Sequence, residues 1–315
     1  MSNIRKTIFS IAFLLFFVSL ISNVLAQTPI TDCTVISQPG EYILVNDIID
    51  SSASKCIDIQ ANDVILDCQN HIIDGVDALA SYGIFVYRDS ATTTNITIKN
   101  CVLTDWDTGI YLRYSSSNTL TNIIANSNTG GLYLGRSNSN TLTNITANSN
   151  TLGIILVSSN SNTLTNITAN SNGNCGLSLL NSNSNTIKDS KFQDNTNYGI
   201  YLSYSSDNLI YNNIFNNLIN FYFDGDIYAN YWNTTRQPGT NIWNSSLGYI
   251  GGNYWTNPNG NGYSDTCVDA NYDGFCDDPY TLATDNIDYL PIAKTIGQFA
   301  LALSVTFNFN KVDFG

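Results

Sequence analysis

The sequence predicts an all-β protein whose short strands wind into a parallel β-helix, and two observations support that fold class. First, the chain repeats itself every 22 or 23 residues from Ser115 to about Asp226. Second, each repeat carries apolar alternations that are too short for helices and are separated by Asn, Ser and Thr. A unit this short cannot bury its apolar face alone, so successive copies must stack into one elongated core.

The repeat supplies three strands and three turns per coil. Near-copies begin at Ser115, Ser137 and Ser159, and looser copies begin at Ser182 and Ser205. The L-x-x-L-x-L frame and the helical return segment of leucine-rich repeats are missing, which leaves the β-helix as the solenoid that fits. Extrapolation back to Ile43 gives about eight coils and a rod about 40 Å long, at a strand spacing of about 4.8 Å.

Polar residues and glycines recur at fixed positions of the repeat, which predicts columns of side chains along the rod. Asn tolerates the left-handed backbone of a sharp turn, and stacked amides can hydrogen-bond from coil to coil. One predicted column is Asp67, Asn100, Asn122, Asn144, Asn166, Asp189 and Asn212, and a second is Asn118, Asn140, Asn162, Asn185 and Asn208. Glycines open the strongest strand of each coil at Gly83, Gly109, Gly131, Gly153, Gly176 and Gly199.

The segments outside the repeats predict the domain organisation. Residues 1–26 resemble a secretory signal peptide, because Arg5 and Lys6 precede an apolar run and Ala26 closes the expected cleavage site. We expect the β-helix over 27–226, a capping region rich in Trp, Tyr and Asp over 227–294, and an apolar tail over 295–315. The cap is expected because an uncovered last coil would expose strand edges.

The net charge and the signal segment indicate where the protein is located and which classes of partner it can bind. Arg5 and Lys6 carry two positive charges, so removal of the signal would change the net charge from −13 to −15. An isoelectric point near 4.1 disfavours nucleic acid and anionic lipid as partners. The apolar run is short and no equal run follows it. We expect a secreted monomer without a membrane span, extracellular or at the cell surface, and periplasmic if the host has a periplasm.

All seven cysteines lie in the exported part of the chain, where disulfides persist. We predict one bridge between Cys33 and Cys56 at the amino-terminal end and another between Cys267 and Cys276 in a tight loop of the cap. Cys68 and Cys101 hold the same position in two coils, so they either bond or stack in the core. Cys175 is left over and is predicted to be a buried, inert thiol.

The sequence resembles a known group, the NosD-like proteins, whose right-handed parallel β-helices carry repeats of the carbohydrate-binding and sugar-hydrolase type. The similarity lies in CTVISQPGEYILVNDI, in CIDIQANDVILDCQNHIIDG, in the coils, and in GGNYW followed by DANYDGFCDDPYTL and NIDYLPI. The resemblance implies a carbohydrate-associated surface protein or, through the family name, a copper-delivery accessory protein. Copper handling favours Met, His and thiolate ligands, whereas the exported part has no Met and only His71, so copper is not expected.

Candidate catalytic residues are confined to the ends of the rod, since Arg136 is the only charged residue between Ser115 and Ile187. Asp105 and Asp107 are two residues apart, which on a strand places them on one face about 6.5 Å apart, and Arg113 could join them. This trio would suit a polysaccharide lyase or a glycoside hydrolase. The alternative is that both carboxylates are turn residues before Gly109. Arg88 and Arg113 fall near each other on adjacent coils and could contact an acidic sugar.

A row of aromatic residues is predicted to point away from the core on the strand that follows each column glycine. Because side chains alternate along a strand, Phe85, Tyr111, Tyr133, Tyr201 and Tyr222 face outward, and Ile155 and Ser178 interrupt the row. Aromatic rings repeating every coil suit the apolar faces of successive sugars. β-propensity alone would also place Tyr there. The row predicts a polysaccharide or cell-surface glycan as partner for a non-catalytic protein.

The cap contains the strongest metal-binding motif of the chain. Its D-x-N-x-D-G run is typical of EF-hand loops, although Tyr280 replaces the acid expected at position twelve and no flanking helices are evident. The candidate ligands of a structural Ca²⁺ ion are Asp269, Asn271, Asp273, Phe275 through its backbone, Asp277 and Asp278. The alternative is a solvated turn stapled by Cys267 and Cys276.

Overall fold

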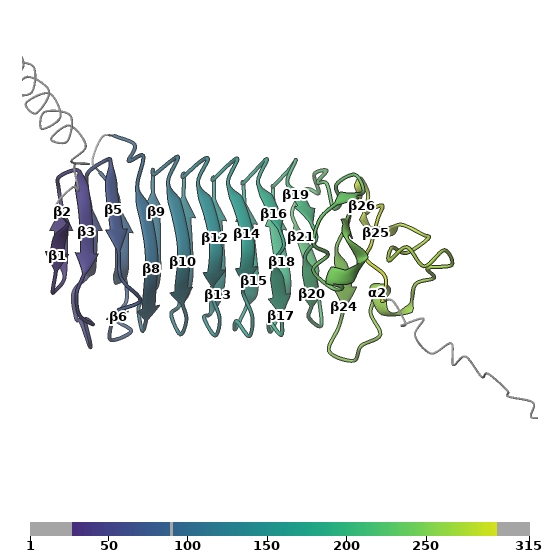
Figure 1. The fold of residues 1–315 in the computed structure, drawn as a ribbon, viewed down its shortest axis with the longest axis horizontal. Coiled ribbons are helices and arrows are strands. Elements are labelled where there is room, and N and C mark those ends of the chain that lie inside the picture. Colours follow the sequence, from purple (N-terminus) through teal and green to yellow (C-terminus); the bar gives the residue numbers. More distant parts are fainter. Residues whose placement is uncertain (1–26, 89–90, 295–315) are drawn as a thin grey trace, which may run out of the picture.

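The structure is a computed structural model that describes residues 27–88 and 91–294, and these residues form a right-handed parallel β-helix closed by an irregular cap (Figure 1). The predicted fold class is therefore confirmed. Each coil contributes strands to two parallel sheets that run the length of the rod. Within the described ranges, no helix has the length and apolarity needed to cross a membrane.

One sheet, here called sheet A, has 13 strands. They are β1 (Thr28–Ile30), β3 (Gly40–Leu44), β5 (Val64–Asp67), β6 (Ile72–Asp74), β8 (Thr97–Thr104), β10 (Thr119–Ala125), β12 (Thr141–Thr146), β14 (Thr163–Thr168), β16 (Thr186–Lys188), β17 (Lys191–Gln193), β19 (Leu209–Tyr211), β20 (Ile214–Asn216) and β24 (Tyr254–Thr256).

The other sheet, sheet B, has nine strands, one per coil. They are β2 (Thr34–Ile36), β4 (Lys55–Ile59), β7 (Tyr82–Val86), β9 (Thr108–Arg113), β11 (Gly130–Gly135), β13 (Leu152–Val157), β15 (Cys175–Leu180), β18 (Tyr198–Ser203) and β21 (Phe221–Asp224). The cap adds two antiparallel pairs, β22 (Gln237–Pro238) with β23 (Tyr249–Ile250) and β25 (Tyr280–Ala283) with β26 (Asn286–Asp288), a 3₁₀ turn at Ser245–Leu247 and the short helix α2 (Tyr263–Thr266).

Two of the three strands expected per coil are continuous in the middle of the rod. In β10, for example, Asn122 adopts a φ of 54°, and the ladder resumes at Ile123 after this single left-handed residue. A bend of one residue turns the chain without interrupting the hydrogen bonds on either side, which is why sheet A folds around two sides of the core. The equivalent bend at Asp189 separates β16 from β17.

Side chains from both sheets fill a continuous interior. In the copy that begins at Ser137 the inward residues are all at most 1% exposed: Leu142, Ile145, Ala147, Ile154 and Leu156. The column glycines sit where the coils approach most closely, since a Cβ on Gly153 would lie 2.4 Å from the carbonyl oxygen of Gly176. Toward the cap the interior becomes aromatic, with Phe192, Phe215 and Trp255 in register and stacked.

The predicted amide columns are present, and they differ in burial and in the groups that they bond. The first column bonds side chain to side chain on the outside, as Asn144 Nδ2 does to Asn122 Oδ1 at 3.0 Å. The second is buried, and Asn162 Oδ1 accepts both the backbone N–H and the side-chain N–H of Asn140. Two further buried columns went unpredicted: Asn128, Asn150, Asn172, Asn195 and Asn217, and Ser115, Ser137, Ser159, Ser182 and Ser205.

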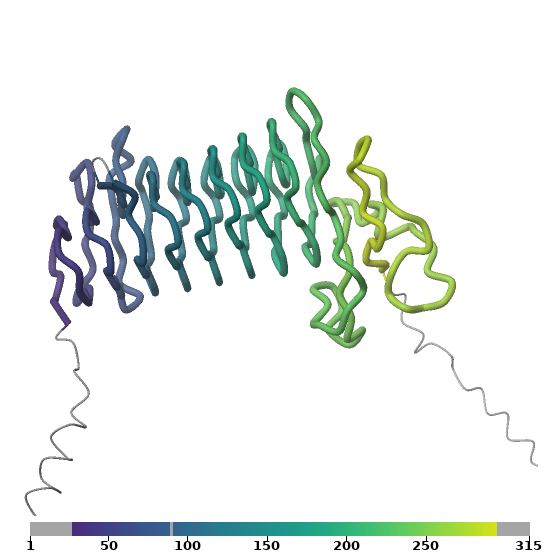
Figure 2. The backbone as a smooth tube through the Cα atoms, turned by 90° about the horizontal axis from the view of Figure 1, so that it is seen from above, coloured from purple at the N-terminus to yellow at the C-terminus, as the bar shows by residue number. Residues whose placement is uncertain are grey.

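The cap continues sheet A and then leaves the line of stacked coils, as seen along the tube in Figure 2. Its strand β24 pairs with β20, and Trp232 and Trp255 close the end of the core. Asp288 is fully buried at its centre and accepts N–H bonds from Asn253, the Trp255 ring and Leu290.

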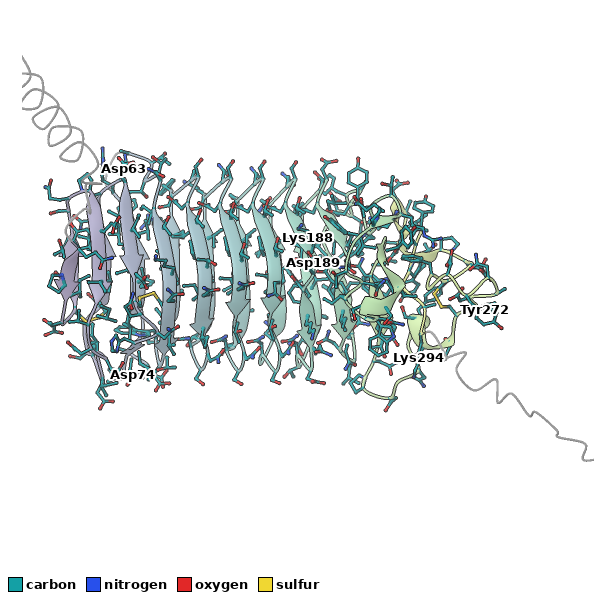
Figure 3. The ribbon with its side chains drawn as sticks, viewed as in Figure 1. Asp63, Asp74, Lys188, Asp189, Tyr272 and Lys294 are labelled. Carbon is teal, nitrogen blue, oxygen red and sulfur yellow. A yellow bond between two sulfur atoms is a disulfide. The ribbon has the colours of Figure 1, made fainter. Side chains whose placement is uncertain are left out.

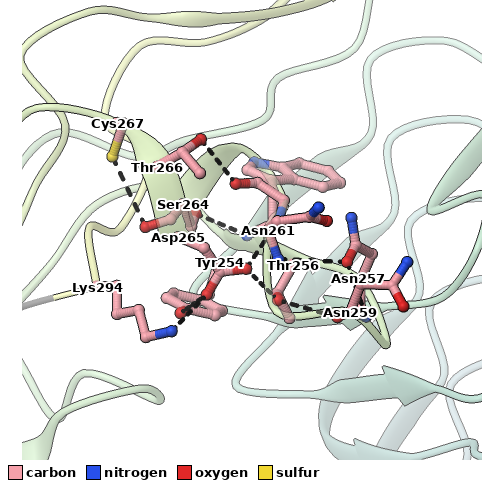
Figure 4. A network of polar contacts seen from close by, with 12 residues as sticks. Tyr254, Thr256, Asn257, Asn259, Asn261, Ser264, Asp265, Thr266, Cys267 and Lys294 are labelled. Atoms are coloured by element: carbon pink, nitrogen blue, oxygen red, sulfur yellow. Dashed lines mark hydrogen bonds and ion pairs between the residues drawn. The ribbon is translucent and has the colours of Figure 1, made fainter.

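A second carboxylate, Asp265, joins α2 to β24 (Figure 4). It accepts bonds from the Tyr254 hydroxyl at 2.8 Å, the Thr256 hydroxyl and the Gly262 N–H, and it lies 3.4 Å from Lys294 Nζ. Burial would raise the pKa of Asp265, but these hydrogen bonds outweigh burial and lower it.

The cysteines confirm both predicted disulfides, Cys33–Cys56 and Cys267–Cys276. Cys68 and Cys101 also form a bond, which settles the alternative left open by the sequence. Cys175 is a free thiol, 3% exposed, as predicted, and burial raises its pKa to about 12.

Candidate functional site

The two sheets present different outer surfaces to solvent. On β12 and β14 the outward positions of sheet A are threonines and asparagines: Thr141, Thr143, Asn144, Thr146, Thr163, Thr165, Asn166 and Thr168. On sheet B the outward row in register is Asp58, Phe85, Tyr111, Tyr133, Ile155, Ser178, Tyr201 and Tyr222. We call this outer surface of sheet B the aromatic face. It contains all five residues of the predicted ligand-binding row.

The row is not uniformly accessible. Phe85 is only 4% exposed, because the Lys55 ammonium lies 4.2 Å above its ring and the Tyr82 ring packs beside it. Tyr111 and Tyr133 are half-buried and meet edge to face at 4.7 Å. Tyr222, at the other end, is 41% exposed. The accessible rings are therefore those beyond Phe85.

The rings form two groups that flank a gap. The amino-proximal group contains Tyr82, Phe85, Tyr87, Tyr111, Tyr114 and Tyr133. In the carboxy-proximal group, Tyr198 stacks on Tyr222 at 4.6 Å and Tyr201 stacks on Tyr222 at 5.8 Å. Between the groups, Ile155 and Ser178 replace the rings. The interruption that the sequence showed is thus a gap in a wall of aromatic side chains.

The gap is a hollow of about 480 Å³ in the aromatic face. Its lining is aliphatic and polar between aromatic ends: Tyr133, Leu152, Ile155, Val157, Asn174, Cys175, Ser178, Leu180, Asn197, Tyr198 and Tyr201. Asn197 Nδ2 donates to Asn174 Oδ1 at 3.0 Å, which holds both amides at its rim. The hollow thus offers apolar surface, amides and hydroxyls without a charged side chain.

The phenol groups at the two ends of the hollow stay neutral. Burial raises the pKa of Tyr133. Burial, followed by a hydrogen bond to Asp224, raises the pKa of Tyr201 to about 12, and the Tyr201 hydroxyl donates to Asp224 Oδ2 at 2.7 Å. Both hydroxyls are therefore protonated around neutral pH.

Arginines adjoin the amino-proximal group. The Arg113 guanidinium lies 4.9 Å from the centre of the Tyr87 ring and 5.7 Å from that of Tyr114. Arg136 lies 5.4 Å from the Tyr114 ring centre and donates to the Tyr114 hydroxyl at 2.5 Å. Arg113 and Arg136 come from adjacent coils, because Arg113 pairs with Gly135 in the ladder.

The predicted catalytic trio is not brought together. Asp105 and Asp107 lie in the turn before β9, whereas Arg113 ends that strand, about 20 Å away along an extended chain. Asp107 Oδ2 accepts the backbone N–H of Ala80. Burial and the nearby carboxylates of Asp74 and Asp77 raise the pKa of Asp105. Asp105 has a φ of 59°, so both carboxylates serve in a turn.

The candidate calcium loop lies at the outer end of the cap, where Tyr272 is exposed (Figure 3). Its carboxylates bond mainly to the loop: Asp269 accepts the N–H groups of Asp273 and Gly274, and Asp277 accepts that of Ala270. Asp273 also pairs with Arg236 at 2.6 Å.

Other candidate ligands of this loop have different surroundings. The Phe275 side chain is buried, and the Asp278 carbonyl accepts the Tyr263 hydroxyl. Among the described residues, no three His, Cys, Asp or Glu side chains are grouped to hold a metal ion. Calcium binding stays a prediction, and a calorimetric titration with Ca²⁺ that gave no heat would remove it.

Several residues of the aromatic face escaped the sequence prediction, including Tyr82, Tyr87, Tyr114 and Tyr198. Tyr82 and Tyr198 directly precede the column glycines Gly83 and Gly199. That position is a second outward column, and at Leu152, Cys175 and Tyr198 it lines the hollow. The position directly before the column glycine was therefore the sequence signal that could have identified Tyr82 and Tyr198.

Comparison with known proteins gives one family match and a set of distant folds. A family model described as "Periplasmic copper-binding protein (NosD)" matches residues 27–260. No curated protein sequence matches the chain.

Among solved structures, the enzymatically active domain of bacteriophage CBA120 tailspike protein 2 aligns at 15% identity and a TM-score of 0.46, over 65% of this chain and 42% of that chain. The pectate lyase Pel9A aligns at 13% identity and a TM-score of 0.45, over 65% of this chain and 69% of that chain. The periplasmic alginate epimerase AlgG aligns at 13% identity and a TM-score of 0.41, over 57% of this chain and 50% of that chain. The chain spans less than half of the tailspike domain.

Proposed function

The chain belongs to the NosD family, and from that premise we propose that it is an exported, non-catalytic glycan-binding protein that holds its ligand on the aromatic face of sheet B. The observation that carries the proposal is the hollow between Tyr133 and Tyr201. A volume of about 480 Å³ lies within the range of ligand sites, which combine apolar walls with a few placed polar groups.

The contrast between the two outer surfaces favours binding over β-propensity as the reason for the rings. Both sheets belong to the same coils and place the same extended backbone at the surface, and Thr and Tyr are both favoured in strands. Propensity alone would distribute rings over both sheets. On β12 and β14 the surface of sheet A consists of threonine and asparagine, while the neighbouring strands of sheet B carry Tyr133, Ile155 and the hollow.

The chemistry of the hollow suits a sugar. The apolar face of a pyranose ring can lie on Tyr133 or Tyr201, and its hydroxyls can bond to the amides of Asn174 and Asn197. Successive coils repeat at about 4.8 Å, comparable to the repeat of sugars in a polymer that follows the rod.

The residues that line the hollow support binding rather than cleavage. Glycoside hydrolysis uses two carboxyl groups that flank the scissile bond, and the lining includes none. The carboxylate of Asp224 contacts the lining from outside the hollow, where its Oδ2 accepts the Tyr201 hydroxyl.

Copper, which the family description names, does not fit the donors of the described residues. His71 bonds through Nδ1 to Asp47 at 2.9 Å, six cysteines are paired in disulfides, and Cys175 is a buried thiol whose pKa is raised to about 12. Cu(I) and Cu(II) favour thiolate, thioether and imidazole ligands. We therefore assign the protein no copper-dependent role. Its three disulfides fit an oxidising, exported location.

Retention and cleavage should be measured together on neutral, uronic and amino polysaccharides. We expect the purified protein to be retained on at least one polymer without releasing new sugar ends. Ser178→Trp, which fills the hollow, should weaken that retention about tenfold or more. Thr143→Trp on sheet A is the matched control and should leave it unchanged. Sustained release of sugar ends would make the protein an enzyme, and no retention on any polymer would remove the proposal.

A further inference from the structure

We infer that the arginines beside the aromatic face recognise the carboxylate of an acidic sugar, so that the glycan is a uronate polymer. This inference rests on the proposed function and adds the class of ligand. The residues are Arg88, Arg113 and Arg136 with Tyr87 and Tyr114, here called the basic corner. Arg88, Arg113, Tyr87 and Tyr114 line a cavity of about 440 Å³ together with Ala91 and Thr92.

The first observation is where the positive charge lies. The chain has a formal net charge of −13, and three of its five arginines gather at this corner. The ion pairs among the described residues use Lys55, His71, Lys99, Lys188, Arg236 and Lys294. None of those pairs includes an arginine of the basic corner. Among the described residues, Arg113 and Arg136 have rings and a hydroxyl rather than a carboxylate as their partners, so an external anion can approach them.

The second observation is how the guanidinium groups are held. Arg113 lies over the rings of Tyr87 and Tyr114, and Arg136 lies over Tyr114 and bonds to its hydroxyl. Stacking on rings restricts both side chains, and a carboxylate can still bind the N–H groups of Arg113 and those of Arg136 that do not contact the Tyr114 hydroxyl. A surface arginine that merely improved solubility would gain nothing from being fixed in this way.

The third observation connects the basic corner to the hollow. Tyr133 lines the hollow, and Arg136 follows the end of the same strand, β11. Gly135 lies between them, where a Cβ would meet the Tyr111 hydroxyl at 3.1 Å and the Tyr133 ring at 3.2 Å, so the rings lean across this glycine. Arg113 pairs with Gly135, so Arg136 lies on the next coil one residue beyond the position of Arg113, and coils about 4.8 Å apart bring both arginines to the same corner of the rod.

The test compares polygalacturonate with the same polymer fully methyl-esterified, which keeps the sugars and removes the charge. We expect the unmodified protein to bind polygalacturonate at least tenfold more tightly than the ester, with an affinity that falls as salt rises. The double variant Arg113→Gln/Arg136→Gln should lose that preference while binding the ester unchanged. Lys191→Gln on sheet A removes an exposed charge elsewhere and should change neither affinity.

Each other outcome has a definite meaning. Equal affinity for polygalacturonate and its ester, or an unchanged preference in the double variant, would overturn the inference. Dextran sulfate binding as tightly as polygalacturonate would show a general oxyanion site and overturn the assignment to a carboxylate. If Ser178→Trp alone abolishes retention of a neutral glycan, the proposed function stands without the inference. If no polymer is retained, both fail. Unchanged thermal unfolding of the double variant would show that the fold is intact.

Discussion

The regular coils and the cap provide hydrogen-bond partners for their buried polar groups in different ways. From Ser115 to Asn208 the coils meet this need by repetition, with columns of Asn and Ser that pass the same bond from coil to coil. The cap meets it at its centre with the buried carboxylate of Asp288, which accepts three N–H groups, two from the segment 253–255 and one from Leu290. Stability is therefore distributed along the rod and concentrated at its end.

The largest effect is expected from Asp288→Ala. The change leaves the N–H groups of Asn253, Leu290 and the Trp255 ring without an acceptor, and each buried orphan costs about 1–3 kcal/mol. We expect a loss of about 3 kcal/mol or more in the free energy of unfolding of the cap, measured by denaturant titration followed through Trp fluorescence. Hydrogen exchange should localise the loss to the cap. A loss below about 1 kcal/mol would contradict the idea that the stability of the cap is concentrated at Asp288.

Gly153→Ala should have the next largest effect. Its Cβ would lie 2.4 Å from the backbone oxygen of Gly176, so the coils must separate locally, and overpacking of this kind costs about 1–3 kcal/mol. Gly173→Ala is the control, because its nearest contact is 3.7 Å and its φ is not positive. Thermal unfolding should separate the two variants clearly. Equal behaviour would show that the coils are looser than the distances indicate.

Asn162→Ala tests a single member of a buried column. It strands two N–H groups of Asn140, and we expect a loss of about 2 kcal/mol. Asn138→Ala removes an exposed acceptor for the N–H of Asn160, which water can replace, so its cost should stay below about 0.5 kcal/mol. Hydrogen exchange should place the loss in Asn162→Ala within a few coils. Loss of protection along the whole rod would contradict distributed stability.

A pH series gives the smallest expected change per step. Burial raises the pKa of Asp288 to about 7, although its N–H donors oppose that rise. The folded carboxyl therefore keeps its proton between about pH 4 and 7, where the unfolded one loses it. Cap stability should fall as pH rises through this window, by at most about 1.4 kcal/mol per unit.

The matched variant for this series is Asp288→Asn, which cannot titrate. It should remove the pH dependence of cap stability across the same window. A difference between the two proteins that grows more favourable to Asp288 as pH rises would contradict the sign.

The sequence was enough to predict what repeats, and much less informative about what occurs once. The Asn and Gly columns could be identified because identical residues return at a fixed interval. The hollow could not, because it depends on the absence of rings at Ile155 and Ser178 and on Tyr198, which lies outside the predicted row. Asp288 is one carboxylate in a segment rich in Asp, and nothing local marks it as buried. Its role depends on contacts with Asn253 and Trp255, more than thirty residues away.

The near-identity of the coils that begin at Ser115, Ser137 and Ser159 means that the gene contains near-identical segments in tandem, each encoding one coil. Unequal recombination between such copies in the gene inserts or deletes one whole coil. The columns stay hydrogen-bonded after such a change, because the coils that become neighbours present the same Asn and Ser residues to each other. The disulfide-bonded start and the cap are untouched. Each coil inserted or deleted in this way would change the length of the rod by about 4.8 Å.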